Sequence, residues 1–161
     1  MAIQAGEKLP GDVKLKEMGE SGPKDVTVGE VFAGKKVVMF AVPGAFTPTC
    51  SAKHLPGFLE KADELKKKGV DEIVCVSVND AFVMGAWGDA NKTKGKVRML
   101  ADGNGDFTKA VGLTLDGTGF GMGHRSQRYA MVVQDGVVKE LLVEPGPGLN
   151  VSSAESVLAK L

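Results

Sequence analysis

Cysteine is scarce in this chain of 161 residues, which contains only Cys50 and Cys75. Two cysteines are too few for the disulfide framework that holds many small secreted proteins together. We therefore expect both thiols to be reduced, so the surroundings of each thiol must decide its role. His, Cys, Asp and Glu residues also do not cluster at the spacing of metal ligands, and the sequence predicts no metal site.

Net charge and long apolar runs are missing as well. The 20 basic residues balance the 20 acidic residues, which gives no support to binding of nucleic acids or anionic membranes. The longest apolar run, residues 37–42, is far shorter than a membrane span. The first residues lack the charged-then-apolar pattern of a secretory signal. We therefore expect a cytoplasmic protein without a membrane or nucleic-acid partner.

The rest of the composition is ordinary for a soluble globular protein. Apolar residues make up 43% of the chain and charged residues 25%. A chain of 161 residues is long enough to bury a substantial core. No internal repeat and no linker interrupts the sequence. It therefore predicts one domain over residues 1–161.

The most distinctive stretch is residues 42–50, VPGAFTPTC. It follows residues 36–42, which are apolar on both faces, as a central strand should be. Two prolines and a glycine fix a non-repeating turn, which ends with Cys50 at the start of a predicted helix. The free N–H groups and the dipole of a helix N-terminus favour a thiolate over a thiol. We therefore interpret Cys50 as reactive, and the alternative is a small buried hydrophobic residue.

An amphipathic helix is predicted from Cys50 to Lys68, because its apolar residues recur along one stripe. Pro56 lies inside this helix and cannot donate the helical hydrogen bond. We therefore expect Pro56 to kink the helix and to loosen the turn that carries Cys50. Thr49 is the better candidate for the helix N-cap. Thr47 is close enough to Cys50 to aim its hydroxyl at the same spot, although it could instead be a turn residue.

Strands and helices alternate in the rest of the chain. Strands are predicted at residues 71–78, 97–101, 129–133 and 137–143, and the last two form a hairpin. A strand, a helix and a strand in this order form a right-handed βαβ unit with parallel strands. The overall order predicts an α/β fold with a mixed β-sheet and helices on both faces.

Two of the predicted helices carry explicit start signals. Asn79 or Asp80 is expected to cap a helix after the second strand. The residues expected on its inner face are Phe82, Val83, Ala86, Trp87 and Ala90. Residues 152–155, SSAE, form a capping box before a final helix. The residues expected on its inner stripe are Ala154, Val157, Leu158 and Leu161.

Glycine is concentrated in residues 117–123, GTGFGMG, a composition that superficially suggests phosphate binding. The segment lacks the preceding strand and the following helix that a dinucleotide fingerprint needs. We therefore interpret it as a flexible loop and predict no cofactor.

The string PGAFTPTC at residues 43–50 resembles the active-site signature of the type II, or peroxiredoxin-5-like, peroxiredoxins. Other segments resemble the same subgroup and occur in the expected order. These segments are KHLPGF at 53–58, SVND at 77–80, FVM at 82–84, AW at 86–87, LADG at 100–103 and RSQRY at 125–129. The resemblance covers nearly the whole chain. It implies a thioredoxin-like fold, which agrees with the predicted order of elements.

The resemblance also implies roles for individual residues. Cys50 would attack a hydroperoxide and become a sulfenic acid. Thr47 and the Cys50 backbone N–H would hold the peroxide. Arg128 matches the arginine that stabilises the thiolate and polarises the peroxide in peroxiredoxins, and Arg125 is the competing choice. Without the resemblance, the residues around Arg128 would indicate a surface arginine. Pro43 matches the proline that shields the site, and it can also be a plain turn residue.

His54 follows Cys50 by four residues and would lie on the same helix face. A cysteine and a histidine can form a hydrolytic pair, but no third member is recognisable in this sequence. We therefore favour a supporting or capping role for His54.

Cys75 is the only other cysteine that could resolve a sulfenic acid on Cys50. It lies inside the predicted strand 71–78, between two valines, where a buried thiol attacks poorly. At about 3.3 Å per residue, it would lie about 10 Å below the sheet edge. A disulfide needs Cα atoms within about 7 Å of each other. We therefore predict a mechanism with one cysteine, regenerated by an external thiol.

The sequence thus predicts a thiol-dependent peroxidase that reduces hydrogen peroxide and alkyl hydroperoxides. The expected reductants are glutathione with glutaredoxin, or thioredoxin, and the resemblance implies a homodimer. The alternative is a redox sensor or a chaperone-like binding module on the same fold, with peroxidation incidental. A thioredoxin-type disulfide reductase is less well supported, because the chain has no C-x-x-C pair.

Overall fold

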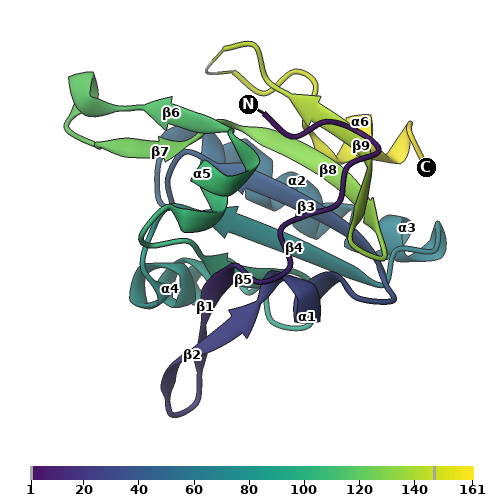
Figure 1. Ribbon diagram of the computed structural model, residues 1–161, viewed down its shortest axis with the longest axis horizontal. Coiled ribbons are helices and arrows are strands. Elements are labelled where there is room, and N and C mark those ends of the chain that lie inside the picture. The colour runs from purple at the N-terminus through teal and green to yellow at the C-terminus, as the bar shows by residue number, and fades with distance from the viewer. Residues whose placement is uncertain (1, 147) are drawn as a thin grey trace.

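The computed structural model describes residues 2–146 and 148–161. Its centre is a seven-stranded sheet in the order β2-β1-β5-β4-β3-β8-β9 (Figure 1). The strands of this sheet are β1 (Lys14–Gly19), β2 (Gly22–Thr27), β3 (Lys36–Val42), β4 (Glu72–Ser77), β5 (Arg98–Ala101), β8 (Tyr129–Gln134) and β9 (Val137–Val143). β3, β4 and β5 are parallel, whereas β8 runs antiparallel to β3. The sheet is mixed, and this part of the prediction is confirmed.

Helices cover both faces of the sheet (Figure 1). They are α1 (Val28–Phe32), the π-helical turn η1 (Cys50–His54), α2 (Leu55–Glu60), α3 (Ala62–Lys67), α4 (Ala81–Asn91), α5 (Asp106–Val111) and α6 (Ala154–Leu158). Side chains of β3 alternate between two buried clusters. Val37 and Met39 pack with α1 and α5, whereas Val38 and Phe40 pack with η1, α2, α3, α4 and α6. Cys50 belongs to the second cluster.

The helix predicted from Cys50 to Lys68 is not continuous, and this prediction is wrong in detail. It begins with the π-helical turn η1, in which the N–H of Leu55 bonds to the carbonyl of Cys50, five residues earlier. Pro56 follows at once in the first turn of α2, where a missing N–H is tolerated. A second break lies at Lys61, between α2 and α3. The irregular turn therefore includes the reactive-cysteine candidate itself.

The inner face of α4 differs from the prediction. Asp80 caps the helix by accepting a hydrogen bond from the N–H of Val83 at 2.8 Å. The buried side of the helix consists of Ala81, Met84, Trp87 and Gly88. Phe82 is 66% exposed, and only Trp87 of the predicted set is buried. Gly88 is closely packed, because a Cβ there would lie 2.9 Å from Thr93 Oγ1 and 3.0 Å from Met99 Cγ. The packed face of α4 therefore combines the large Met84 and Trp87 with the small Ala81 and Gly88, and the predicted inner face is wrong except for Trp87.

The start of α6 is shifted by one residue from the predicted capping box. Ser153, not Ser152, is the N-cap, and its hydroxyl accepts a hydrogen bond from the N–H of Ser156 at 3.1 Å. The Ser152 hydroxyl instead donates to Glu144 Oε2 at 2.7 Å. The predicted inner stripe is confirmed, since Ala154 and Val157 are buried and the two leucines pack against the same cluster.

The glycine-rich residues 117–123 connect β6 (Thr114–Asp116) to β7 (His124–Ser126) in a small separate hairpin. The hairpin projects from the body of the molecule (Figure 1). Its tip contains a short 3-10 turn, η2 (Thr118–Phe120). The segment predicted as a loop is therefore the tip of a hairpin with a defined turn.

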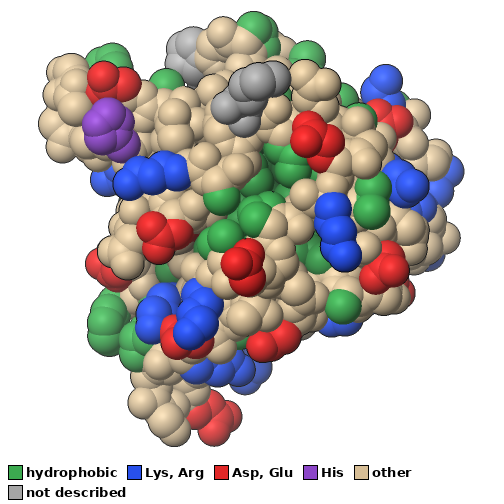
Figure 2. Space-filling view, viewed as in Figure 1, with side chains coloured by type: hydrophobic (Ala, Val, Ile, Leu, Met, Phe, Trp, Pro, Cys, Tyr) green, Lys and Arg blue, Asp and Glu red, His purple; other side chains and the backbone are tan. Residues whose placement is uncertain are grey.

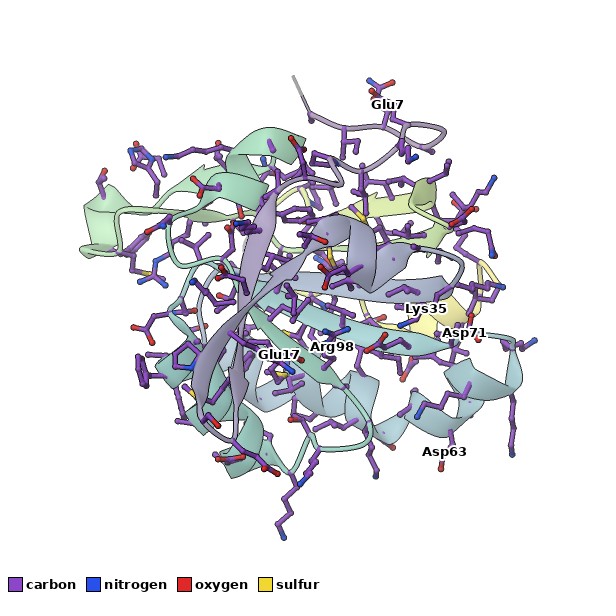
Figure 3. The ribbon with its side chains drawn as sticks, turned by 60° about the horizontal axis from the view of Figure 1, so that its bottom comes forward. Glu7, Glu17, Lys35, Asp63, Asp71 and Arg98 are labelled. Atoms are coloured by element: carbon purple, nitrogen blue, oxygen red, sulfur yellow. The ribbon has the colours of Figure 1, made fainter. Side chains whose placement is uncertain are left out.

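The face that carries α1 and α5 has hydrophobic side chains near its middle, with acidic and basic side chains scattered around them (Figure 2). On the neighbouring side, Arg98 of β5 lies beside Glu17 of the N-terminal hairpin, which consists of β1 and β2 and forms one edge of the same sheet (Figure 3). Its guanidinium donates to Glu17 from Nε at 2.7 Å and to Glu72 from Nη1 at 3.3 Å. These charged contacts link β1, β5 and β4.

Candidate active site

The turn that carries Cys50 lies at the carboxyl end of β3, next to the end of β4. Asn79, just after β4, accepts the Ala45 N–H at 3.0 Å and the Ser77 hydroxyl proton at 2.6 Å. The Ser77 hydroxyl also lies 3.2 Å from the Val42 carbonyl oxygen. These contacts fix the first part of the turn, from Val42 to Ala45, to the end of β4 and the residues that follow it. The sequence offers Asn79 only as an alternative to Asp80 for the helix cap and gives Ser77 no role, although both lie in the SVND segment at the predicted strand end; Asp80 is the cap, and Asn79 instead holds the turn.

Arg128 reaches Cys50 because of the sheet topology. β8 runs antiparallel to β3 and Tyr129 pairs with Ala41, so Arg128 lies at the edge where β3 ends. The Cys50 side chain is fully buried, and Arg128 is only 6% exposed. The Arg128 Nη2 donates to Cys50 Sγ at 3.2 Å. Arg128 is therefore a cationic hydrogen-bond donor placed directly on the sulfur.

Arg125, the competing choice, has other partners. Its Nη1 donates to the Val78 carbonyl at 3.2 Å, and its Nε donates to the Met122 carbonyl at 2.9 Å. A Cβ on Gly44 would lie 3.3 Å from Arg125 Nη1, so the guanidinium packs over the turn. The structure therefore places Arg128 on the sulfur and Arg125 on the outside of the turn.

The two threonines of the turn differ in geometry. The Thr47 hydroxyl donates to the Gly44 carbonyl at 2.6 Å, which orients its oxygen and leaves that oxygen able to accept. Thr49 has helical backbone angles and makes no capping hydrogen bond, so its prediction as the N-cap is wrong. The first helical bond runs from the Ser51 N–H to the Thr47 carbonyl, at 2.9 Å. The helical turn therefore starts earlier than predicted. Pro43 is half-buried at the start of the turn.

His54 contacts Arg128 and not the Cys50 sulfur. Arg128 Nη1 lies 3.0 Å from His54 Nδ1, and His54 Nε2 lies 2.9 Å from the Ser152 carbonyl oxygen. A guanidinium only donates, so Nδ1 must accept and Nε2 must carry the proton. Burial, together with the positive charge of Arg128, lowers the pKa of His54 to about 4. The imidazole is therefore neutral at neutral pH and holds one arm of Arg128.

The lowered pKa of His54 predicts a loss of stability in mild acid. The unfolded chain takes up this proton near the ordinary value of 6.5, whereas the folded protein resists it until about pH 4. The contribution of His54 to the free energy of unfolding is therefore complete above about pH 6.5. It is lost as the pH falls toward 4, and the change is about 3 kcal/mol. Urea unfolding at several pH values measures it. His54→Gln should flatten the profile, whereas His124→Gln, at the exposed histidine, should not; equal profiles for both variants would contradict the assignment.

Cys75 lies in β4, opposite Phe40 of β3 and Met99 of β5. Its side chain shares the second buried cluster with Cys50, so both thiols lie on the same face of the sheet. Burial raises the pKa of the Cys75 thiol well above its ordinary value, and the nearby Cys50 adds to the effect. Cys75 is therefore a protonated thiol, and among the described residues no donor contacts its sulfur as Arg128 contacts that of Cys50.

Comparisons with known proteins identify the family of this chain. A family model described as Redoxin matches residues 4–158. Peroxiredoxin-2E, chloroplastic, of Arabidopsis thaliana is 51% identical over 164 residues, which cover 99% of this chain and 70% of that relative. The chain belongs to the peroxiredoxins of the Redoxin family. Like its relatives, this peroxiredoxin is a thiol-dependent peroxidase.

Solved structures give the same result for the fold. Reduced Prx3 in complex with H2O2 from Vibrio vulnificus superposes with a TM-score of 0.93 at 55% identity, covering 98% of both chains. Peroxiredoxin 5 from Alvinella pompejana has a TM-score of 0.86 at 37% identity, covering 98% of this chain and 96% of that one. The predictions of a thioredoxin-like fold and of a type II, peroxiredoxin-5-like subgroup are therefore confirmed.

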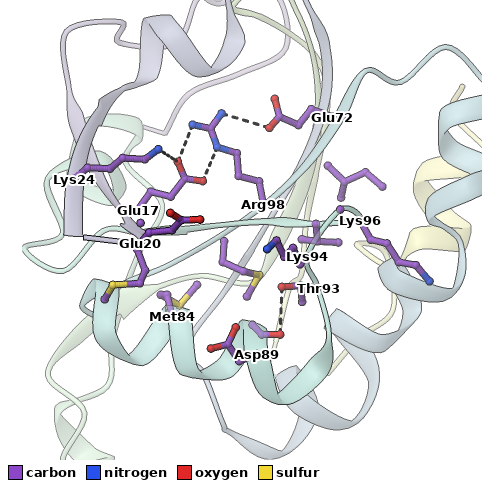
Figure 4. Close-up of a pocket in the computed structure, with 18 of the residues that line it drawn as sticks. Glu17, Glu20, Lys24, Glu72, Met84, Asp89, Thr93, Lys94, Lys96 and Arg98 are labelled. Atoms are coloured by element: carbon purple, nitrogen blue, oxygen red, sulfur yellow. Dashed lines mark hydrogen bonds and ion pairs between the residues drawn. The ribbon is translucent and has the colours of Figure 1, made fainter. Parts of the chain in front are cut away.

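A groove of about 860 Å³ lies on another part of this peroxiredoxin, between the N-terminal hairpin, α4 and the start of β5 (Figure 4). Its lining includes both signs of charge, with Arg98 held between Glu17 and Glu72. Cys50, His54 and Arg128 are not among the residues that line it. The groove is therefore separate from the cysteine site.

No helix within residues 2–146 and 148–161 is long and apolar enough to cross a membrane. In the same part of the chain, no three His, Cys, Asp or Glu side chains are grouped so that they could hold a metal ion.

Proposed function

We propose that Cys50 is the residue that attacks peroxide, and that Arg128 and Thr47 are the groups that hold and polarise the peroxide. The observation that carries this proposal is the 3.2 Å contact between Arg128 Nη2 and Cys50 Sγ inside a buried turn. The Cys50 thiolate attacks one peroxide oxygen, the O–O bond breaks, and Cys50 becomes a sulfenic acid. The departing oxygen leaves as hydroxide or alkoxide and takes up a proton.

Ionisation of the thiol accounts for only a small part of a fast peroxidase. An ordinary thiol is already several per cent ionised at neutral pH, so complete ionisation gains about tenfold. The remaining acceleration requires a peroxide held in line with the sulfur and a donor for the charge that develops on the departing oxygen. The Arg128 guanidinium has the donors for this task. The Thr47 hydroxyl oxygen, oriented by its bond to the Gly44 carbonyl, can accept a hydrogen bond from the O–H of the bound peroxide.

Hydrogen peroxide and alkyl hydroperoxides are the proposed substrates, and an external thiol is the proposed reductant. The related Prx3 from Vibrio vulnificus is described in complex with H2O2, which supports the first of these. Glutathione with glutaredoxin, or thioredoxin, would reduce the sulfenic acid on Cys50. Steady-state peroxide consumption with each system in turn would identify the better reductant.

A mechanism with one cysteine predicts that Cys75→Ser keeps most of the turnover supported by the external thiol. The reasons are the burial of Cys75 within β4 and its raised pKa, since a protonated thiol attacks a sulfenic acid poorly. The measurement is turnover with glutathione and glutaredoxin, with mass spectrometry after one equivalent of peroxide. A stoichiometric Cys50–Cys75 disulfide, together with loss of turnover in Cys75→Ser, would contradict this mechanism.

A homodimer and a cytoplasmic location are also proposed. Phe46, Phe82 and Phe120 are all more than half exposed, and aromatic side chains are enriched at protein interfaces. Sedimentation velocity tests the dimer. The location stays a prediction, because peroxiredoxin-2E of Arabidopsis thaliana is named as chloroplastic.

A further inference from the structure

Glu144 is a buried acidic residue that directly follows β9. Its backbone N–H donates to the Arg128 carbonyl at 2.9 Å, so the two residues face each other across the end of the β8–β9 pair. Glu144 is only 5% exposed. A buried carboxylate is costly unless donors compensate its charge. The Glu144 carboxylate therefore needs hydrogen-bond donors inside the protein.

One oxygen of Glu144 receives four hydrogen bonds from a single short segment. Oε2 accepts the N–H groups of Asn150 at 2.9 Å, Val151 at 2.8 Å and Ser152 at 2.8 Å, and also the Ser152 hydroxyl at 2.7 Å. Successive N–H groups that converge on one point form an anion-binding nest, and bonds to a charged acceptor are stronger than neutral ones. The carboxylate therefore fixes the conformation of residues 150–152.

The fixed segment is connected to the cysteine by three further contacts. The Ser152 carbonyl accepts the Nε2 proton of His54 at 2.9 Å. This bond sets the tautomer that leaves Nδ1 free to accept from Arg128 Nη1 at 3.0 Å. The other arm of the same guanidinium donates to Cys50 Sγ at 3.2 Å. A continuous set of hydrogen bonds thus runs from Glu144 to the sulfur.

Two buried charged groups, Arg128 and Glu144, lie along this path. No carboxylate of the described residues lies within ion-pair distance of Arg128, although the guanidinium is buried. Glu144 and Arg128 act on the His54 imidazole in opposite senses, Glu144 raising its pKa and Arg128 lowering it. Glu144 therefore supplies negative charge close to the imidazole that holds Arg128.

We propose that Glu144 is a positioning residue for peroxide attack. It holds residues 150–152 so that the Ser152 carbonyl fixes the His54 tautomer and His54 keeps Arg128 on the Cys50 sulfur. The proposal rests on the roles of Cys50 and Arg128 proposed above. Glu144 itself touches neither the peroxide nor the reacting sulfur.

Glu144→Gln tests the proposal, because glutamine keeps the shape of the side chain and removes its charge. The rate of Cys50 oxidation by hydrogen peroxide, followed by stopped flow, should fall about tenfold, as expected when a charged acceptor is replaced by a neutral one. The ¹⁵N resonances of the His54 imidazole should show loss of the single Nε2–H tautomer. Glu155→Gln, an exposed glutamate in the first turn of α6, is the matched control and should leave both measurements unchanged.

The same substitution in an Arg128→Ala background separates positioning from general damage. If Glu144 acts through Arg128, adding Glu144→Gln to the Arg128→Ala protein should slow its oxidation by less than a further factor of two. An equal tenfold loss in both backgrounds, or an unchanged rate and tautomer in Glu144→Gln, would overturn the proposal. An Arg128→Ala protein that reacts at the normal rate would instead overturn the function proposed above.

Ser152→Ala replaces Glu144→Gln if that variant fails to fold. It removes one of the four bonds to Oε2 and keeps the backbone carbonyl that His54 contacts. The expected loss is about threefold, the size of one modest hydrogen bond. This loss should likewise vanish in the Arg128→Ala background, and its persistence there would overturn the proposal.

Discussion

Cys50→Ser should abolish peroxide turnover while the fold remains intact. A serine hydroxyl fits the space of the thiol and can still accept from Arg128, but it is not a nucleophile toward peroxide. The loss should be complete, because in the proposed mechanism every turnover passes through the sulfenic acid on Cys50. Reductant-coupled peroxide consumption measures the effect, and circular dichroism checks the fold.

Cys75→Ser is the matched control for this experiment, since it removes the other buried thiol. It should leave the fold intact and keep most of the turnover. Near wild-type turnover in Cys50→Ser would show that the reacting thiol has been wrongly assigned, and the proposed mechanism would then fail as a whole.

Arg128→Ala has the second largest expected effect, a slowing of peroxide attack by about a hundredfold. This is the usual loss when one donor to a developing negative charge is removed. The substitution removes both the contact to Cys50 Sγ at 3.2 Å and the cation beside the sulfur. Stopped-flow oxidation of the reduced protein by hydrogen peroxide measures the rate directly.

Arg125→Ala is the comparison variant for Arg128→Ala. Arg125 donates to the carbonyls of Val78 and Met122 and packs over the turn, so its loss should slow the reaction by a smaller factor. A larger loss in Arg125→Ala than in Arg128→Ala would mean that the wrong arginine has been assigned to the peroxide.

Five strands of the central sheet, β3, β4, β5, β8 and β9, could be predicted from the sequence because their segments carry a strong signal. β3 and β4 are buried on both faces, so their segments are continuous apolar runs, and their order with the intervening helix implies parallel pairing. The predicted strand 71–78 corresponds to β4, and the predicted hairpin corresponds to β8 and β9. These features depend on local composition, which the sequence displays directly.

Helix details were harder to predict because they depend on packing partners. The inner face of α4 was misassigned, since Gly88 is packed closely against Met99 whereas Phe82 faces solvent. No periodicity of hydrophobic residues can identify a glycine as the contact residue. Ser152 was likewise assigned to a capping box, but its hydroxyl is bound by Glu144, a residue eight positions earlier.

The residues of the candidate site also differ in how strongly the local sequence indicates them. Cys50 and Thr47 could be proposed from one short turn, because a cysteine at a helix N-terminus after a strand is itself a chemical signal. Arg128 was selected through the family resemblance, since its own surroundings in the sequence suggest a surface residue. Glu144 was missed altogether, because its relation to the site depends on contacts with residues 150–152 and on the pairing of β8 with β9.

The most direct test of the central claim is the number of peroxide molecules consumed per protein molecule when a thiol reductant is in excess. The account predicts many equivalents, with Cys50 returning to the thiol after each turnover. A redox sensor or a binding module would consume about one equivalent and then stop with Cys50 oxidised. Consumption that stops near one equivalent with every thiol reductant tried would contradict the account.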